Sequence, residues 1–207
     1  MVYRNAAHCA PQSGRARRLI QVKRHGAARC FIALMPNPIA AWHADHVRFG
    51  RLLDMLEKEV ALFHSGEQPN YELMRDIVLW LRHYADGVHH PREDLAFERM
   101  VQRDPDLRIP VNRLLQEHRI IAYAGESLLE RLENAANGGF APRAELEAAA
   151  ATFLAYYRSH MATEEGMILP RAAALLHEAD WAAVAAVVPK EDARTAQALR
   201  VARGLGL

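Results

Sequence analysis

Apolar residues recur every three or four positions along most of this chain, which is the spacing of one face of an α-helix. The strict alternation that is typical of strands does not occur in these stretches. Turn and cap residues divide the pattern into four long amphipathic helices. The first is predicted from Ile39 to Phe63, the second from about Asn70 through Glu93, the third after Asp104-Pro105 as far as Asn137, and the fourth from Pro142 to Leu175.

Four such helices with short connections predict an all-α, up-down-up-down four-helix bundle. We expect the bundle to occupy residues 35–177, and residues 178–207 to add one or two short C-terminal helices. A chain of 207 residues with 51% hydrophobic residues is long enough to bury one core of this kind.

Metal-binding residue types interrupt the apolar stripe of every predicted helix. Leucine would be the usual residue there, yet the stripes carry His46, His89, Glu93, His118, His160 and Glu164. Each histidine taken alone is compatible with an ordinary core imidazole. Two buried carboxylates without partners would cost several kcal/mol each, however, and a shared cation would remove that cost.

Two of the helices carry a histidine and a glutamate four residues apart, namely His89 with Glu93 and His160 with Glu164. Residues with this spacing lie about 6 Å apart along the helix axis, so both side chains can reach one ion or two neighbouring ions. Both cysteines, Cys9 and Cys30, lie outside the predicted bundle. Imidazole and carboxylate ligands without thiolate favour iron or manganese, and zinc fits them as well.

The residues next to these candidates are predicted to point elsewhere. Consecutive residues are about 100° apart on a helix, so His89 and His90 should not both face the interior. The apolar neighbours favour His89 as the inward residue, and the same reasoning favours Glu164 over Glu165. We expect His90 to orient a ligand histidine.

At these residues the chain resembles the hemerythrin-like, HHE cation-binding family. The resemblance covers about residues 38–177 and rests on Asp45-His46, the stretch from His89 to Asp94, Glu117-His118, the stretch from His160 to Glu165, and Ile168-Leu169-Pro170. Members of the family are four-helix bundles that hold two non-haem irons, bridged by an oxo or hydroxo group and two carboxylates. By this resemblance Glu93 and Glu164 would bridge the irons, and the four histidines would be terminal ligands.

The chain departs from the oxygen-carrying members at Ala122, where they have a second histidine one turn after the third-helix ligand. One iron would then lack a protein ligand. His43, His90, Glu117 or water would have to fill that position.

The resemblance implies a metal-binding protein that takes up dioxygen or nitric oxide, or responds to redox state, without catalysing a reaction. The alternatives are an enzyme of iron and oxygen chemistry, such as peroxide or nitric oxide turnover or iron-sulfur repair, and a structural bundle held by zinc or a single metal. The physiological ligand and the oligomeric state do not follow from the sequence.

Charge separates residues 1–34 from the rest of the chain. They contain seven of the 26 basic residues and none of the 25 acidic ones. A nucleic-acid or membrane-surface arm and a targeting peptide are both compatible with this composition. We favour upstream sequence before a true start at Met35, with no ordered structure. No stretch reaches the roughly 20 apolar residues of a membrane span, so we expect a cytoplasmic protein with neither membrane nor nucleic-acid partners.

Overall fold

The computed structural model describes residues 38–139 and 142–187, together with residue 204. These residues form helices and turns without a strand, as the periodicity predicts. The leader over 1–34 lies outside the described residues, and so does most of the predicted C-terminal appendage. The domain boundaries at these two ends therefore stay predictions.

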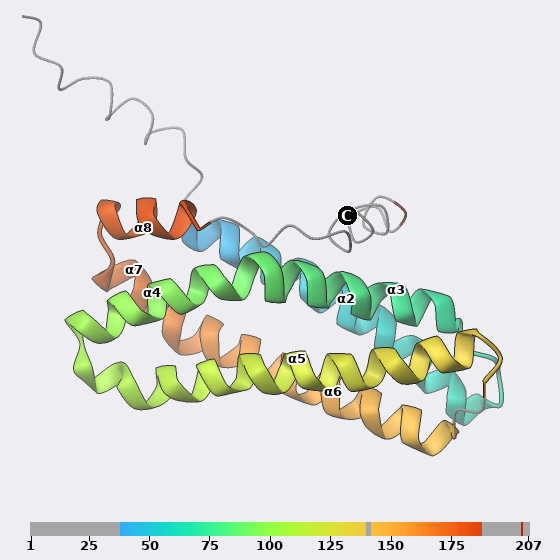
Figure 1. Cartoon of the computed structure of the whole chain (residues 1–207). Helices are drawn as coiled ribbons and strands as arrows, with labels where there is room; N and C mark the ends of the chain where they lie inside the picture. The colour runs from blue at the N-terminus through green and yellow to red at the C-terminus, as the bar shows by residue number, and fades with distance from the viewer. Residues whose placement is uncertain (1–37, 140–141, 188–203, 205–207) are drawn as a thin grey trace, which may run out of the picture. The chain divides into compact units, whose positions relative to one another are not determined.

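The bundle has four arms, two of which are interrupted by a π-helical segment (Figure 1). The arms are α2 (Pro38–Ser65); α3 (Tyr71–Leu81) with η1 (Arg82–His89) and α4 (His90–Arg103); α5 (Arg108–Ala136), entered through the short 3-10 helix η2 (Pro105–Leu107); and α6 (Arg143–Thr163) with η3 (Glu164–Ile168) and α7 (Leu169–Leu175). Helix α8 (Glu178–Ala185) follows.

Local signals begin and end these helices where the sequence predicts. The Asn70 side chain accepts a hydrogen bond from the Leu73 amide at 3.0 Å and so caps α3. Gly138 follows α5 with a φ of 74°, which lets the chain reverse toward α6. Helix α2 contacts α3 and α6, and α5 contacts the same two helices, so the arms form a closed ring of neighbours. The four-helix bundle is confirmed.

The core consists of two apolar clusters along the bundle. One lies between α2 from Phe49 onward, α3, the second half of α5, and α6, and includes Phe49, Leu81 and Phe153. The other lies where α4 and the start of α5 meet α7 and α8, and includes Phe97 and Leu114. In sequence order every arm passes from one cluster to the other, and its metal-binding residue types lie at that passage.

The two π-helical segments lie at the His/Glu pairs. Segment η1 ends at His89, and segment η3 begins at Glu164. A proline follows each of them, Pro91 in α4 and Pro170 in α7. Proline has no N–H to donate to the preceding turn, which favours a local change of helical pattern there. A π turn also rotates the following residues relative to an uninterrupted α-helix, and this changes which side chains face the core.

Helix α8 packs against the end of the bundle that carries α4. The indole of Trp181 meets that of Trp42 edge to face, with ring centres 5.5 Å apart. Asp180 of α8 forms an ion pair with Arg103 at 2.6 Å. Trp42 in turn lies against the imidazole of His89, so α8 supports one side of the polar layer. No helix in the described part of the chain is long and apolar enough to cross a membrane.

Candidate metal centre

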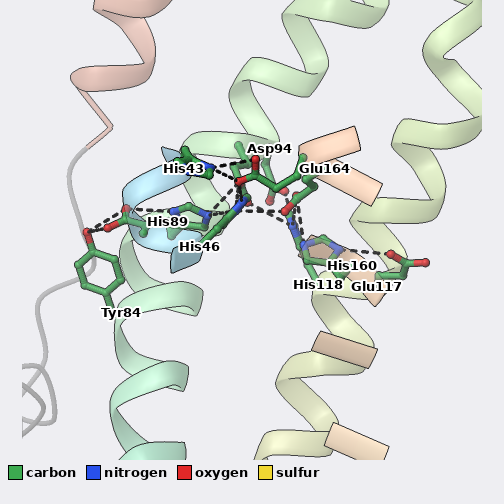
Figure 2. Close-up of polar contacts among 12 residues, drawn as sticks. His43, His46, Tyr84, His89, Asp94, Glu117, His118, His160 and Glu164 are labelled. Carbon is green, nitrogen blue, oxygen red and sulfur yellow. Dashed lines mark hydrogen bonds and ion pairs between the residues drawn. The ribbon is translucent and has the colours of Figure 1, made fainter. Parts of the chain in front are cut away.

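The structure brings all six predicted residues together in the interior of the bundle. Each arm contributes one of the four histidines (Figure 2). The two glutamates come from α4 and η3. All six side chains are buried, and both glutamates are only 1% exposed. The residues are His46, His89, Glu93, His118, His160 and Glu164.

The two carboxylates lie between two sets of imidazoles, His46 with His89 and His118 with His160. Glu93 directs Oε1 toward the Nε2 atoms of His89 and His46, at 2.9 and 3.6 Å, and Oε2 toward that of His118 at 3.5 Å. Glu164 directs Oε2 toward His46 Nε2 at 3.4 Å. Its other oxygen, Oε1, lies 3.1 Å from His160 Nε2 and 3.7 Å from His118 Nε2. Each glutamate therefore offers one oxygen to each set of imidazoles.

The outer nitrogen of each of these histidines is held by a carboxylate. His46 donates through Nδ1 to Glu165 at 2.7 Å, and His89 donates in the same way to Asp45 at 3.2 Å. His118 donates to Asp94 at 2.8 Å, and His160 donates to Glu117 at 3.2 Å. Such a bond fixes the tautomer and leaves Nε2 free to bind a metal.

These four bonds form a closed ring around the bundle. The second arm's His89 is held by Asp45 of α2, and the third arm's His118 by Asp94 of α4. In the same way Glu117 of α5 holds the histidine of the fourth arm, and Glu165 of the fourth arm holds that of α2. Each arm thus orients the ligand of the next, and the geometry of the site depends on all four arms.

The expectation that His90 points away from the interior is wrong. Its side chain is 5% exposed, and its ring stacks on that of His118 with centres 4.0 Å apart and planes 13° apart. The ring of His160 lies 5.7 Å away. His90 follows directly on η1, and the π turn brings both adjacent histidines to the core. Asp86, one turn earlier, lies 3.5 Å from His90 Nδ1.

With His90 included, the donors form two groups that could each hold an ion. One group is His46, His89 and Glu93, and the other is His90, Glu93, His118 and His160. Glu93 belongs to both. His90 therefore occupies the side of the centre where Ala122 leaves out a histidine.

Other neighbours also differ from the sequence-based expectation. Glu165 does not point only to solvent. It accepts a hydrogen bond from His46 and another, at 3.0 Å, from the more exposed His43. Glu117 orients a ligand through its contact with His160, and Arg113 holds its other oxygen at 2.8 Å.

The inner atoms of the centre fit a cation. Buried oxygens of Glu93 and Glu164 and the Nε2 atoms of His118 and His160 have no hydrogen-bond partner among the described residues. Leaving such atoms unpaired is costly, and metal coordination would satisfy them. Nitrogen and oxygen donors of this kind suit iron, manganese and zinc.

Electrostatics lead to the same conclusion. Burial alone would lower the pKa of His89, but the charge of Glu93 and the hydrogen bond to Asp45 raise it to about 10. Burial alone would lower the pKa of His118, but the hydrogen bond to Asp94 and the nearby carboxylates of Glu164 and Glu93 raise it to about 11. The pKa of Glu93 lies well below its usual value because the surrounding imidazoles oppose the effect of burial. The centre thus keeps its carboxylates ionised and collects positive charge, which protons or metal ions can supply.

His90 behaves differently from the other imidazoles. Burial, reinforced by the neighbouring positive charge of His118, holds its pKa well below 6.5. It is therefore neutral at physiological pH, the form in which histidine binds metals. Burial also raises the pKa of Asp86, the carboxyl beside it, to about 6.

A family model for the hemerythrin HHE cation binding domain matches residues 37–172. This range contains every residue of both donor groups and all four carboxylates of the ring. No curated protein matches the chain. The match spans well over half of the sequence and agrees with the bundle and its buried His/Glu cluster, so the chain belongs to the hemerythrin HHE cation-binding family.

Proposed function

We propose that this protein holds two non-haem irons in the bundle and binds a small diatomic ligand there, dioxygen or nitric oxide. The observation that carries the proposal is the placement of Glu93 and Glu164, each of which offers one oxygen to each set of imidazoles. A single ion would use one side of this arrangement and leave the oxygens on the other side unpaired in the core.

The donor set supports iron as the metal. It consists of imidazoles and carboxylates, and both cysteines of the chain lie outside the family match. Non-haem iron centres commonly use such ligands. When bound, a pair of irons would supply the reversible one-electron chemistry that dioxygen or nitric oxide binding requires.

The two sides of the centre are unequal, which indicates where a ligand would enter. Three imidazoles, those of His90, His118 and His160, lie on one side, and two, those of His46 and His89, lie on the other. Both glutamates serve both sides. The side with His46 and His89 has one protein donor fewer, so it leaves more room for an external ligand.

This chain's own residues would prepare the centre for that ligand. The carboxylate ring keeps each Nε2 pointed inward, and Phe49 covers the open side, with its ring 5.0 Å from that of His89 and 6.2 Å from that of His46. Trp42 lies on His89 as well. These apolar rings would shield that side of the centre from bulk water, which favours a small diatomic molecule over larger polar substrates.

The test begins with protein produced in iron-rich medium and analysed for metal. Two irons per chain are expected. The reduced protein is then exposed to dioxygen or nitric oxide under otherwise anaerobic conditions while its visible spectrum is followed. A spectral change that reverses when the gas is removed supports binding.

Other outcomes would contradict the proposal. One metal per chain, or zinc alone after growth in iron, would indicate a structural site. Continued consumption of nitric oxide or peroxide by the loaded protein would indicate an enzyme.

A further inference from the structure

A chain of polar contacts leads from the centre to a tyrosine on the neighbouring helix turn. His89 donates through Nδ1 to Asp45 Oδ2 at 3.2 Å, and the Tyr84 hydroxyl donates to both oxygens of the same carboxylate at 3.1 Å (Figure 2). One carboxylate thus joins the phenol to a candidate iron ligand. The ring of His118 has no such tyrosine on its carboxylate, Asp94, among the contacts of the described residues.

The ring of Tyr84 is held in place on both sides. It stacks on Trp80 with ring centres 5.0 Å apart and planes only 8° apart. Arg48 lies over the ring at 5.9 Å and forms an ion pair with Asp45 at 3.0 Å. The phenol therefore has a fixed orientation toward its acceptor, and the carboxylate has a fixed orientation toward His89.

A phenol loses an electron readily only if its proton can leave at the same time, since the oxidised phenol is a very strong acid. Asp45 is an acceptor within direct hydrogen-bond reach of that proton. A second tyrosine near the centre has no such acceptor in the described part of the chain. Tyr157 is buried against His90, and its hydroxyl has no hydrogen-bond partner among the described residues. The two tyrosines therefore form a natural comparison.

We propose that Tyr84 donates one electron to the iron centre when hydrogen peroxide reacts with a centre in which only one of the two irons is ferrous. This electron donation would protect the protein against peroxide. Peroxide takes two electrons and two protons as its O–O bond breaks, and two waters form. One electron comes from the ferrous ion, which becomes ferric, and the other from Tyr84. Both protons come from solvent, while the proton of the Tyr84 hydroxyl moves to Asp45, which becomes protonated. The product on the protein is a neutral tyrosyl radical.

The proposal rests on the proposed iron centre but concerns a different property, so the two can fail separately. The full chain is loaded with iron, its iron content is measured, and it is oxidised by one electron and mixed with hydrogen peroxide. Samples are frozen rapidly and examined by electron paramagnetic resonance. We expect a tyrosyl radical signal that narrows when the protein is grown with ring-deuterated tyrosine.

Two matched variants assign the radical. Tyr84→Phe keeps the ring stacked on Trp80 and removes the hydroxyl, so the signal should fall to the level of iron-free protein. Tyr157→Phe should keep the full signal. Mass spectrometry of peptides after peroxide treatment should find oxidation at residue 84 in wild type. Circular dichroism and iron content show whether each variant still folds and binds metal.

The outcomes separate the two proposals. An iron content near zero defeats the iron centre and this inference with it. Full iron content without a radical in wild type overturns the inference alone. A radical that persists in Tyr84→Phe, or disappears in Tyr157→Phe, also overturns it. The deuterium narrowing and the peptide analysis need no substitution, so they decide the matter even if Tyr84→Phe does not fold.

Discussion

Replacing His90 with alanine is expected to weaken the binding of one metal ion and to leave the other in place. His90 is buried, stacks on His118 and belongs to the donor group on that side of the centre. The other group, with His46 and His89, does not include it. The variant should therefore show two different affinities where the wild type binds both ions tightly.

The size of the effect follows from the position of His90. Removing an outer partner that only orients a ligand costs about 10–100-fold in metal affinity. Loss of a direct donor should equal or exceed the upper end of that range, about 100-fold or about 2.7 kcal/mol for the affected ion. The bundle should still fold, because the apolar clusters on both sides of the layer stay intact.

The assay is competition with a chelator of known affinity, carried out on anaerobic protein with ferrous iron or cobalt as the probe. His64→Ala is the matched control, since His64 is exposed near the end of α2 and pairs with Glu147. His90→Gln provides a second variant of similar volume. Both affinities should be unchanged in the control, and one should fall in each His90 variant.

Ala122 completes this test. It follows His118 by one helical turn, so Ala122→His would place an imidazole on the same side of the centre. The substitution should restore the second ion in the His90→Ala background and add little to wild type. If His90→Ala binds both ions as tightly as wild type, His90 is not a ligand, and the position beside Ala122 is open after all.

Two further predictions concern the same layer, and a third concerns the helix packing next to it. Glu93→Gln should abolish tight binding of both ions, whereas Asp94→Asn should cost only about 10–100-fold, because Glu93 lies between the two sets and Asp94 holds one histidine from outside. Saturating the metal-free protein at pH 7 should release two or more protons, measured with an indicator in weak buffer, because the pKa values of His89 and His118 are about 10 and about 11 and that of His46 is also raised. Gly125→Ala should lower the unfolding free energy by about 1–3 kcal/mol, measured by denaturant titration, because a Cβ there would lie 2.9 Å from the Arg82 side chain.

Each of these has a clear contrary result. Equal losses from both carboxylate substitutions would mean that Glu93 does not bridge. The stabilisation that metal-free protein gains from protonated His89 and His118 is complete below pH 6.5 and is lost as the pH rises through about 10 and about 11. Metal ions compete with these protons for the two histidines, so metal affinity should rise with pH over the same interval. Release of no protons on metal binding would refute the raised pKa values of His89 and His118. Unchanged stability of Gly125→Ala would show that Arg82 moves aside freely.

The sequence alone was sufficient for the bundle and for the six inward residues. Helical periodicity needs only local information, and a histidine or glutamate on an apolar stripe is buried wherever that stripe is buried. For this reason all six of these residues, including Glu93 and Glu164, lie in the core as predicted. Cap and turn residues such as Asn70 and Gly138 also act locally, so the helix ends could be read from the chain.

Two features of the centre depended on tertiary structure. The prediction for His90 failed because it assumed an uninterrupted α-helix, and the π turn before it changes the angle between neighbouring side chains. In the second π-helical segment, η3, Ile168 is buried and Met167 is exposed. Prolines 91 and 170 mark these places in the sequence, but a proline does not by itself specify a π turn.

The carboxylate ring is the second such feature. Asp45, Glu117 and Glu165 each adjoin a ligand in the sequence, and Asp94 adjoins Glu93, so every one of them was visible as a candidate. Each of them holds a histidine on a different arm, however, and periodicity along one helix contains no information about the rotation of another. The residues and their inward direction were thus determined locally, whereas their pairing was decided by how the four arms pack.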